Sequence, residues 1–242
     1  MNSRQPALRL DPSLDWKLIS SVYAQASRIH IQPFLAVDCA EAIYRCLTTE
    51  IPWQLHFNVG DRPIDLPGAI FDELPQLERS RLLDCVHASA GQRFQYLFNN
   101  FPISDVYERG EQRSLYLMRL YEFLNSAEFL EFARHVTGVR TIAVTDAQAT
   151  LYLSGHFLAH HDDLQSDKKR VAAYVLNFTP QWVPDWGGIL QFIAPDGHIT
   201  EGYTPTFNAL NLFRVPQLHS VSYIAPFAQA GRYSITGWLR EA

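Results

Sequence analysis

A run of short apolar segments after Gly138 limits the possible folds of this chain more than any other feature. The segments are rich in β-branched and aromatic residues, and turns such as Ser154-Gly155 and Pro195-Asp196-Gly197 separate them. This pattern is typical of antiparallel strands. The segments are VRTIAVTDAQATLYL, GHFLAHHD, RVAAYVLNF, GGILQFI, TFNALNLF, HSVSYIA and RYSITGWL. They predict roughly seven or eight strands in a jelly-roll type of barrel or sandwich.

Helical patterns dominate the part of the chain before Gly138. We expect helices over residues 38–47, 73–98, 111–124 and 126–137, and short strands over residues 28–34 and 53–57. Asp38 is a candidate N-cap for the first of these helices, Ser126 is one for the last, and Gly138 is a natural stop. Residues 57–75 contain several glycines and prolines, so we expect a loop there that borders the substrate entrance.

These patterns predict one domain that spans residues 1–242. Its fold class is α+β but mainly β: a double-stranded β-helix, or jelly-roll, barrel that N-terminal helices buttress. Residues 1–137 would supply helical support and a lid. Residues 138–242 would form the barrel core and hold the functional site at its mouth.

Charge and cysteine content exclude several classes of protein. The net charge of −5 gives no electrostatic reason to bind nucleic acid or an anionic membrane. Cys39, Cys46 and Cys85 are an odd number at irregular spacing, which argues against a disulfide framework or a zinc knuckle. No apolar run approaches the ~18 residues that span a bilayer, and the N-terminus has no signal-like apolar core. We therefore expect a cytoplasmic protein.

The stretch LAHHDDLQSD, residues 158–167, concentrates two histidines and two aspartates. Side chains alternate between the faces of a strand, so His160 pairs with Asp162, and His161 pairs with Asp163. Either pair presents an imidazole and a carboxylate on one face, and strand alternation alone leaves both pairs open. His219 begins a later strand and is the best candidate for a third ligand. Two imidazoles and one carboxylate with open positions opposite form the facial triad of non-haem iron(II) oxygenases.

Arg232 begins the last strand-like segment, thirteen residues after His219. An arginine that points into a barrel beside a metal is an expensive buried charge unless an anion pairs with it. A dicarboxylate that chelates the metal at one end and meets Arg232 at the other fits this arrangement. Thr236 faces the same way on the strand and is placed to donate a hydrogen bond to the same carboxylate.

The stretch from Asp146 to Leu239 resembles the prolyl-hydroxylase-like branch of the 2-oxoglutarate- and iron(II)-dependent oxygenases. The resemblance rests on six pieces at family-like intervals: LYLSGHFLAHHDD, RVAAYVLNFTPQW, GGILQF, TFNALNLF, HSVSYIA and GRYSITGWL. A fainter likeness lies at IHIQPFLAVDCAEAIYRCL. The resemblance implies a jelly-roll hydroxylase that uses Fe(II), 2-oxoglutarate and dioxygen and acts on a prolyl residue of a protein or peptide.

The same resemblance assigns roles to residues. It implies that the iron ligands are His161, Asp163 and His219, because the interval to the VLN motif selects this pair over His160 and Asp162. It also implies that the far carboxylate of 2-oxoglutarate is bound by Arg232, Thr236 and Tyr152. The chain departs from the family at Val175, where a second tyrosine often stands. The aspartate ligand is present, whereas related halogenases replace it with a small residue.

The sequence leaves other functions open. The same chemistry on a free amino acid or a small metabolite is compatible with the motifs, because a fold does not determine its substrate. A non-catalytic jelly-roll interaction module is a second alternative. A metal phosphohydrolase is a third, but such sites place their histidine–aspartate pairs on helices, and here the flanking residues alternate as in strands.

Overall fold

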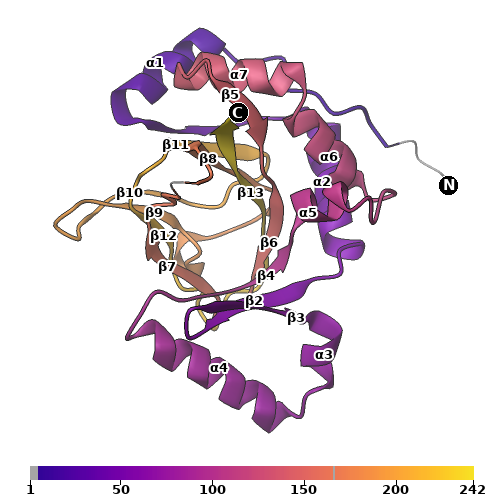
Figure 1. The fold of residues 1–242 in the computed structure, drawn as a ribbon, viewed down its shortest axis with the longest axis vertical. Helices are drawn as coiled ribbons and strands as arrows, with labels where there is room; N and C mark the ends of the chain where they lie inside the picture. The colour runs from indigo at the N-terminus through magenta and orange to yellow at the C-terminus, as the bar shows by residue number, and fades with distance from the viewer. Residues whose placement is uncertain (1–4, 166) are drawn as a thin grey trace.

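The computed structural model describes residues 5–165 and 167–242, which form a barrel of antiparallel strands with helices on its outside (Figure 1). The strands are β1 (Arg28–Ile31), β2 (Gln54–Val59), β3 (Arg62–Pro67), β4 (Tyr96–Phe101), β5 (Ile142–Thr145), β6 (Gln148–Tyr152), β7 (Phe157–His161), β8 (Arg170–Asn177), β9 (Leu190–Ile193), β10 (Ile199–Tyr203), β11 (Ala209–Arg214), β12 (His219–Val221) and β13 (Arg232–Glu241). The helices are α1 (Trp16–Ala26), α2 (Val37–Thr49), α3 (Gly68–Glu73), α4 (Gln76–Ala90), α5 (Ile103–Glu108), α6 (Tyr116–Leu124) and α7 (Ala127–Thr137), with a 3₁₀ turn η1 (Pro184–Trp186).

Hydrogen bonds connect all of these strands into one sheet that curls on itself. The strand order is β1-β11-β8-β13-β6-β4-β7-β12-β9-β10, while β2 and β3 extend from β4 and β5 pairs with the end of β13. The mainly β jelly-roll fold is therefore confirmed. The division near residue 138 stays a prediction about domain organisation, and the sheet takes strands from both sides of that point.

The long strand β8 separates two apolar cores. Its residues Tyr174 and Leu176 face outward and pack against the helices, in a cluster that includes Phe34, Phe129 and other large side chains. Its residues Ala173 and Val175 face the barrel interior, where they pack with Phe213. Burying each large apolar side chain contributes about 1.5–3 kcal/mol, so the helical layer holds the outer face of the sheet firmly.

Two of the expected helices form almost as the sequence predicts. In α7, the hydroxyl of Ser126 accepts a hydrogen bond from the backbone N–H of Phe129, and Gly138 ends the helix with φ of 73°. Helix α2 forms over the expected residues, but the prediction that Asp38 is its N-cap is wrong. Ala36 is the N-cap, and Asp38 lies in the first turn, where its carboxylate pairs with Arg9 at 2.9 Å. A carboxylate in the first turn complements the helix dipole.

The region from residue 57 to residue 98 differs most from expectation. The predicted loop over residues 57–75 is instead the β2–β3 hairpin, which turns at Gly60 with φ of 62°, followed by the short helix α3. The predicted helix over residues 73–98 ends at Ala90, and its last part is strand β4. Strand β4 pairs with β2, β6 and β7, so these long-range pairings override the local helical pattern.

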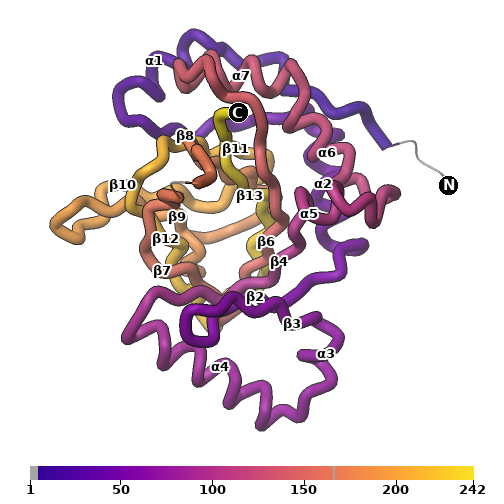
Figure 2. Tube along the Cα trace, in the orientation of Figure 1, coloured from indigo at the N-terminus to yellow at the C-terminus, as the bar shows by residue number. Residues whose placement is uncertain are grey.

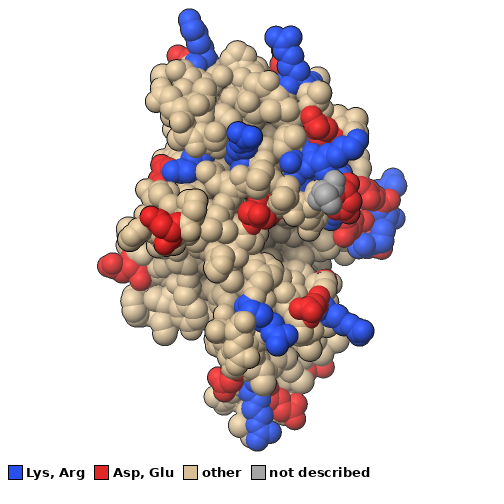
Figure 3. Space-filling model, turned by 60° about the vertical axis from the view of Figure 1, so that its left-hand side comes forward, with Lys and Arg blue, Asp and Glu red and all other residues tan. Residues whose placement is uncertain are grey.

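Segments that are distant in the sequence lie side by side around the barrel. Figure 2 shows the indigo helix α1 beside the pink helix α7, and the yellow strand β13 among strands from the middle of the chain. Figure 3 shows acidic and basic side chains interspersed over one face of the molecule, with a hollow near its middle. Among the described residues, no helix combines the length and the apolar character that crossing a membrane requires.

Candidate active site

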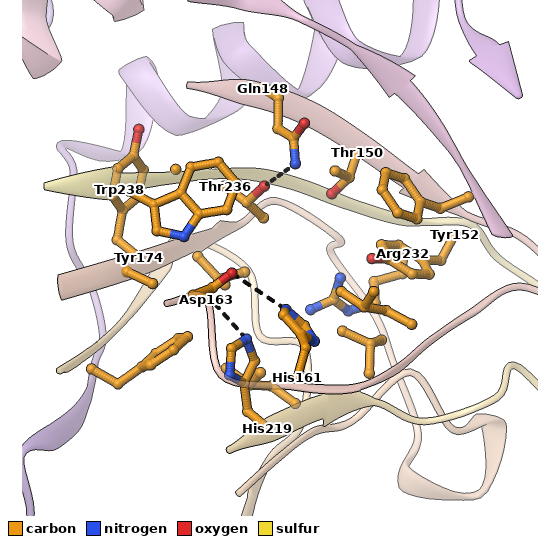
Figure 4. Close-up of a pocket in the computed structure, with 18 residues that line it drawn as sticks. Gln148, Thr150, Tyr152, His161, Asp163, Tyr174, His219, Arg232, Thr236 and Trp238 are labelled. Carbon is orange, nitrogen blue, oxygen red and sulfur yellow. Dashed lines mark hydrogen bonds and ion pairs between the residues drawn. The ribbon is translucent and has the colours of Figure 1, made fainter. Parts of the chain in front are cut away.

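Two side chains of the histidine–aspartate cluster, His161 and Asp163, meet the predicted third ligand, His219, inside the barrel (Figure 4). His161 ends β7 and His219 begins β12, and the two residues are direct partners across the strands. Asp163 lies between them: one carboxylate oxygen is 3.4 Å from Nε2 of His161, and the other is 3.4 Å from Nε2 of His219. One potential ligand atom from each residue lies within 4.8 Å of the other two, so the group could hold a metal ion.

The route by which Asp163 reaches this group differs from the one expected. It does not lie on the strand, because β7 ends at His161 and Asp163 has a left-handed φ of 63°. Strand β7 also contains a bulge: His219 and Val221 on β12 stand opposite His161 and Leu158, two residues against three. Leu158 therefore lines the same cavity as His161. We call this cavity the chamber; its polar lining residues include Gln148, Thr150, Tyr152, His161, Asp163, His219, Arg232 and Thr236. The expectation that strand alternation places Asp163 beside His161 is wrong, since the strand ends at His161 and a turn brings the two side chains together.

The alternative pair lies away from the chamber. His160 and Asp162 are both exposed on the outside of the barrel. A carboxylate oxygen of Asp162 accepts a hydrogen bond of 3.0 Å from the backbone N–H of Leu164, which stabilises the turn after β7. The structure thus brings together His161 and Asp163, and it leaves the other pair in solvent.

Backbone carbonyls orient both imidazoles in the cluster. Nδ1 of His161 lies 3.0 Å from the carbonyl of Ala159, and Nδ1 of His219 lies 2.7 Å from that of Gln217. A ring whose Nδ1–H donates to a carbonyl presents the lone pair of Nε2 to a metal. Burial, together with the charge of His161, lowers the pKa of His219 to about 4, so this imidazole is neutral at neutral pH.

The carboxylate of this cluster is ionised. Burial acts to raise the pKa of Asp163, but the hydrogen bond to His161 and the charges of both histidines outweigh it and lower the pKa. Two imidazole nitrogens and one carboxylate are therefore available together. This donor set suits a divalent transition metal such as iron(II).

The far end of the chamber contains a buried, unpaired positive charge. Arg232 is 1% exposed, its Nε has no hydrogen-bond partner, and no described Asp or Glu forms an ion pair with it. Burial lowers its pKa. Its guanidinium carbon lies 5.1 Å from the centre of the Tyr152 ring, which in turn stacks on Phe98. A buried arginine without a carboxylate partner is strongly unfavourable unless an anion binds to it.

Three residues that are partners across adjacent strands line the chamber between its two ends. Thr236 on β13 is the direct partner of Gln148 on β6 and of Val175 on β8. The side-chain N–H of Gln148 donates a 3.3 Å hydrogen bond to the hydroxyl of Thr236. Tyr174, one residue from Val175, donates its hydroxyl to the carbonyl of Asp146 at 2.7 Å and packs in the outer core. It therefore does not replace the tyrosine that is absent at Val175.

The chamber meets a second, polar hollow at its rim. Gln148 and Trp238 line both spaces. The guanidinium of Arg170 lies 3.5 Å from the centre of the Trp238 ring and donates to the carbonyl of Asp163 at 3.2 Å. We call this hollow the vestibule; its charged lining residues are Asp105, Glu108, Asp146, Lys168, Arg170 and Arg240.

Three residues line the chamber or its rim that the sequence did not predict there: Phe98, Gln148 and Arg170. Gln148 could have been predicted, because it lies four residues before Tyr152 on the same strand and therefore on the same face. Phe98 could not be predicted as a chamber residue, because its segment has a helix-compatible sequence and becomes strand β4 only through pairing with other strands. Arg170 stands at a strand end beside an irregular pairing with Arg240, where alternation gives no guidance.

The residues present fit an iron ion and a dicarboxylate in one chamber. The His-Asp-His group offers three ligand atoms at one end. The orphaned guanidinium of Arg232 offers the complement of a carboxylate at the other end.

Comparison with known proteins agrees with this chemistry. Residues 147–240 match the model of the 2OG-Fe(II) oxygenase superfamily. The prolyl 3-hydroxylase OGFOD1 of Mus musculus is 29% identical over 119 residues, which cover 46% of this chain and 21% of that protein. This chain therefore spans about a fifth of the length of this curated relative.

Solved structures show the same fold. A prolyl-4-hydroxylase from Pseudomonas putida aligns with a TM-score of 0.62 at 17% identity, covering 94% of this chain and 99% of that chain. A prolyl hydroxylase from Trichoplax adhaerens, solved in complex with a peptide fragment of the hypoxia inducible factor oxygen degradation domain, aligns with a TM-score of 0.62 at 14% identity, covering 93% and 89%.

The matched family segment contains the whole His-Asp-His group and the orphaned arginine. The family uses Fe(II), 2-oxoglutarate and dioxygen, for which these residues are suited. The segment over residues 147–240 is thus similar to the 2OG-Fe(II) oxygenase superfamily, and the chain has the jelly-roll fold of solved prolyl hydroxylases.

Proposed function

We propose that this protein hydroxylates an unactivated C–H bond of a prolyl residue in a protein or peptide and converts 2-oxoglutarate and dioxygen to succinate and CO2. One observation carries the proposal. The unpaired guanidinium of Arg232 and the His-Asp-His group line one chamber, as a chelating dicarboxylate requires.

The residues of the chamber have separate tasks in this proposal. Nε2 of His161, Nε2 of His219 and the carboxylate of Asp163 hold the metal. Bound iron(II) would supply the activation of dioxygen, for which 2-oxoglutarate provides two electrons as it is converted to succinate and CO2 and the C–H bond provides the other two. Arg232 binds the far carboxylate of 2-oxoglutarate through charge-assisted hydrogen bonds, and Thr236 donates to the same carboxylate.

Aromatic residues complete the binding end of the chamber. The Tyr152 ring faces Arg232 and stacks on Phe98 with ring centres 5.0 Å apart. We assign Tyr152 to the co-substrate site, where it limits the rotation of the guanidinium and excludes water. Exclusion of water strengthens the pairing between the guanidinium and a carboxylate.

A peptide substrate suits the rim of the chamber. Asp105 and Lys168 are exposed and line the vestibule beside Trp238. A carboxylate and an ammonium group at such a rim can bind the main-chain N–H and carbonyl groups of an extended peptide. The named relatives are prolyl hydroxylases, and one of them was solved with a peptide, which supports a prolyl target. A cytoplasmic location remains part of the proposal.

The test measures succinate and oxygenated product together. Purified protein, Fe(II) and 2-oxoglutarate are incubated in air with a library of proline-containing peptides, with the same peptides carrying alanine for proline, and with free L-proline. We expect succinate formation and the gain of one oxygen only with proline-containing peptides. Turnover with free L-proline and with none of the peptides would favour the small-molecule alternative. Absence of 2-oxoglutarate binding would favour a non-catalytic module.

A further inference from the structure

The hydrogen bond from Gln148 to Thr236 occupies a lone pair of the threonine hydroxyl. The donor is the side-chain N–H of Gln148 on β6, and the acceptor is the hydroxyl of its strand partner on β13. A hydroxyl has one hydrogen to donate and two lone pairs that accept. Among the described residues, the Thr236 hydroxyl has no other hydrogen-bond partner, so its own hydrogen remains available.

The neighbours of Thr236 on both adjacent strands leave its hydroxyl hydrogen free to point into the chamber. On the opposite side, the strand partner of Thr236 is Val175, an apolar residue that packs with Phe213. The polar support of Thr236 therefore comes from β6 alone. Figure 4 shows Gln148 bonded to Thr236 from one side, while Arg232 lies farther along the same chamber.

We infer that Gln148 is a positioning residue for 2-oxoglutarate: by donating to the Thr236 hydroxyl, it directs that hydroxyl to donate to the carboxylate that Arg232 binds. This inference rests on the proposed function. It also explains how the chamber can bind a dicarboxylate with Val175 in place of a polar residue, since the glutamine on β6 orients the hydroxyl from the other side.

A double-mutant cycle tests the inference by binding alone. Isothermal titration measures the Kd of 2-oxoglutarate for protein loaded with Mn(II), so that no turnover occurs. The variants are Gln148→Met, which keeps the length of the side chain but donates nothing, Thr236→Val, and the double variant. Since a net hydrogen bond to a charged group is worth about 1.5–3 kcal/mol, we expect Thr236→Val to weaken binding about tenfold or more.

The cycle separates positioning from a general effect on the chamber. Gln148→Met should weaken binding several-fold in the wild-type background and change it less than twofold in the Thr236→Val background. Equal losses in both backgrounds, or no loss in the first, would overturn the inference. Failure of the wild-type protein to bind 2-oxoglutarate would instead overturn the proposed function.

Gln148→Glu distinguishes the direction of the hydrogen bond. A carboxylate only accepts, so it would draw the Thr236 hydrogen away from the chamber, and binding should weaken further than with Gln148→Met. Its negative charge would also repel the ligand, but that repulsion would persist in the Thr236→Val background. Gln191→Glu is the matched control: Gln191 accepts from Ser220 at 3.3 Å on another strand and does not line the chamber. It should bind 2-oxoglutarate as the wild type does.

Discussion

Arg232 and Tyr152 are direct partners on β13 and β6, and the guanidinium carbon lies 5.1 Å from the centre of the tyrosine ring. This is the main interaction that the buried guanidinium makes with the surrounding side chains. A ring face stabilises a cation by about 2 kcal/mol when both are desolvated, which is far less than the cost of burying the charge. The buried charge of Arg232 is therefore left uncompensated until an anion binds to it.

Replacing Arg232 should weaken 2-oxoglutarate binding without lowering the free energy of unfolding. Arg232→Met should weaken 2-oxoglutarate binding on the order of 100-fold, since truncating one partner of a buried charged pair costs about 2–5 kcal/mol. Without ligand, the free energy of unfolding should stay equal or rise, because an unpaired buried charge is removed. Titration calorimetry and denaturant unfolding measure the two effects.

Arg240→Met is the control for that experiment. Arg240 lies on the same strand and pairs with Asp146 at 2.9 Å at the partly exposed rim. The variant should bind 2-oxoglutarate within a few-fold of the wild type. Equal losses in the two variants would contradict the assignment of Arg232 as the anion anchor.

The two aspartates of the cluster should differ in metal binding. Asp163→Ala removes the carboxylate that bridges both imidazoles, so the purified protein should lose its metal. Asp162→Ala removes only the acceptor of the Leu164 N–H and should cost about 0.5–1.5 kcal/mol of stability while the metal is retained. Metal analysis of both proteins after dialysis measures the difference. Metal loss from Asp162→Ala alone would show that the ligand pair is assigned wrongly.

Gly237 has no room for a side chain. A Cβ there would lie 1.9 Å from the carbonyl oxygen of Asp146 and 2.7 Å from the Tyr174 hydroxyl. Gly237→Ala should push the strand between Thr236 and Trp238 out of place and destabilise the protein by at least about 2 kcal/mol.

Gly91→Ala is the matched control, because its Cβ would meet only an ordinary contact at 3.6 Å. Thermal unfolding of both variants provides the comparison. The close packing around Gly237 would be refuted if both variants unfolded at the same temperature.

His156 should make stability depend on pH. It is 6% exposed, Nδ1 has no partner, and burial lowers its pKa from 6.5 to about 4, with a further contribution from the nearby His87. The unfolded state therefore binds more protons than the folded state between about pH 6.5 and about pH 4. As the pH falls from about 6.5 to about 4, the free energy of unfolding should decrease, by on the order of 3 kcal/mol at most.

His156→Gln removes this titration. The free energy of unfolding of the variant should fall less steeply below about pH 6.5 than that of the wild type, whatever its value at neutral pH. Denaturant unfolding at several pH values measures the slope. Identical slopes would show that His156 is not kept neutral by burial.

The barrel was predictable because its strands are short, alternating and punctuated by turns. The cluster at residues 160–163 was predictable as a candidate site because four charged or titratable residues rarely stand together in a core strand. Strand alternation could not separate the two pairs, since the bulge at Leu158 and the left-handed Asp163 arise from local backbone geometry.

Other parts of the fold depend on long-range pairing. Strand β4 has a helix-compatible sequence and becomes a strand because β2, β6 and β7 lie beside it. The role of Gln148 likewise depends on the register between β6 and β13, which brings it opposite Thr236. Neither the partner strands nor the register can be read from a single segment.

Turnover under isotopically labelled dioxygen tests the central claim most directly. The protein is incubated with Fe(II), 2-oxoglutarate and the proline-containing peptides, and mass spectrometry follows the label. If this protein is a 2-oxoglutarate-dependent hydroxylase, one labelled oxygen atom enters succinate and the other enters the peptide, in equal amounts. Unlabelled succinate, or a peptide without label in the presence of bound 2-oxoglutarate and iron, would contradict the account.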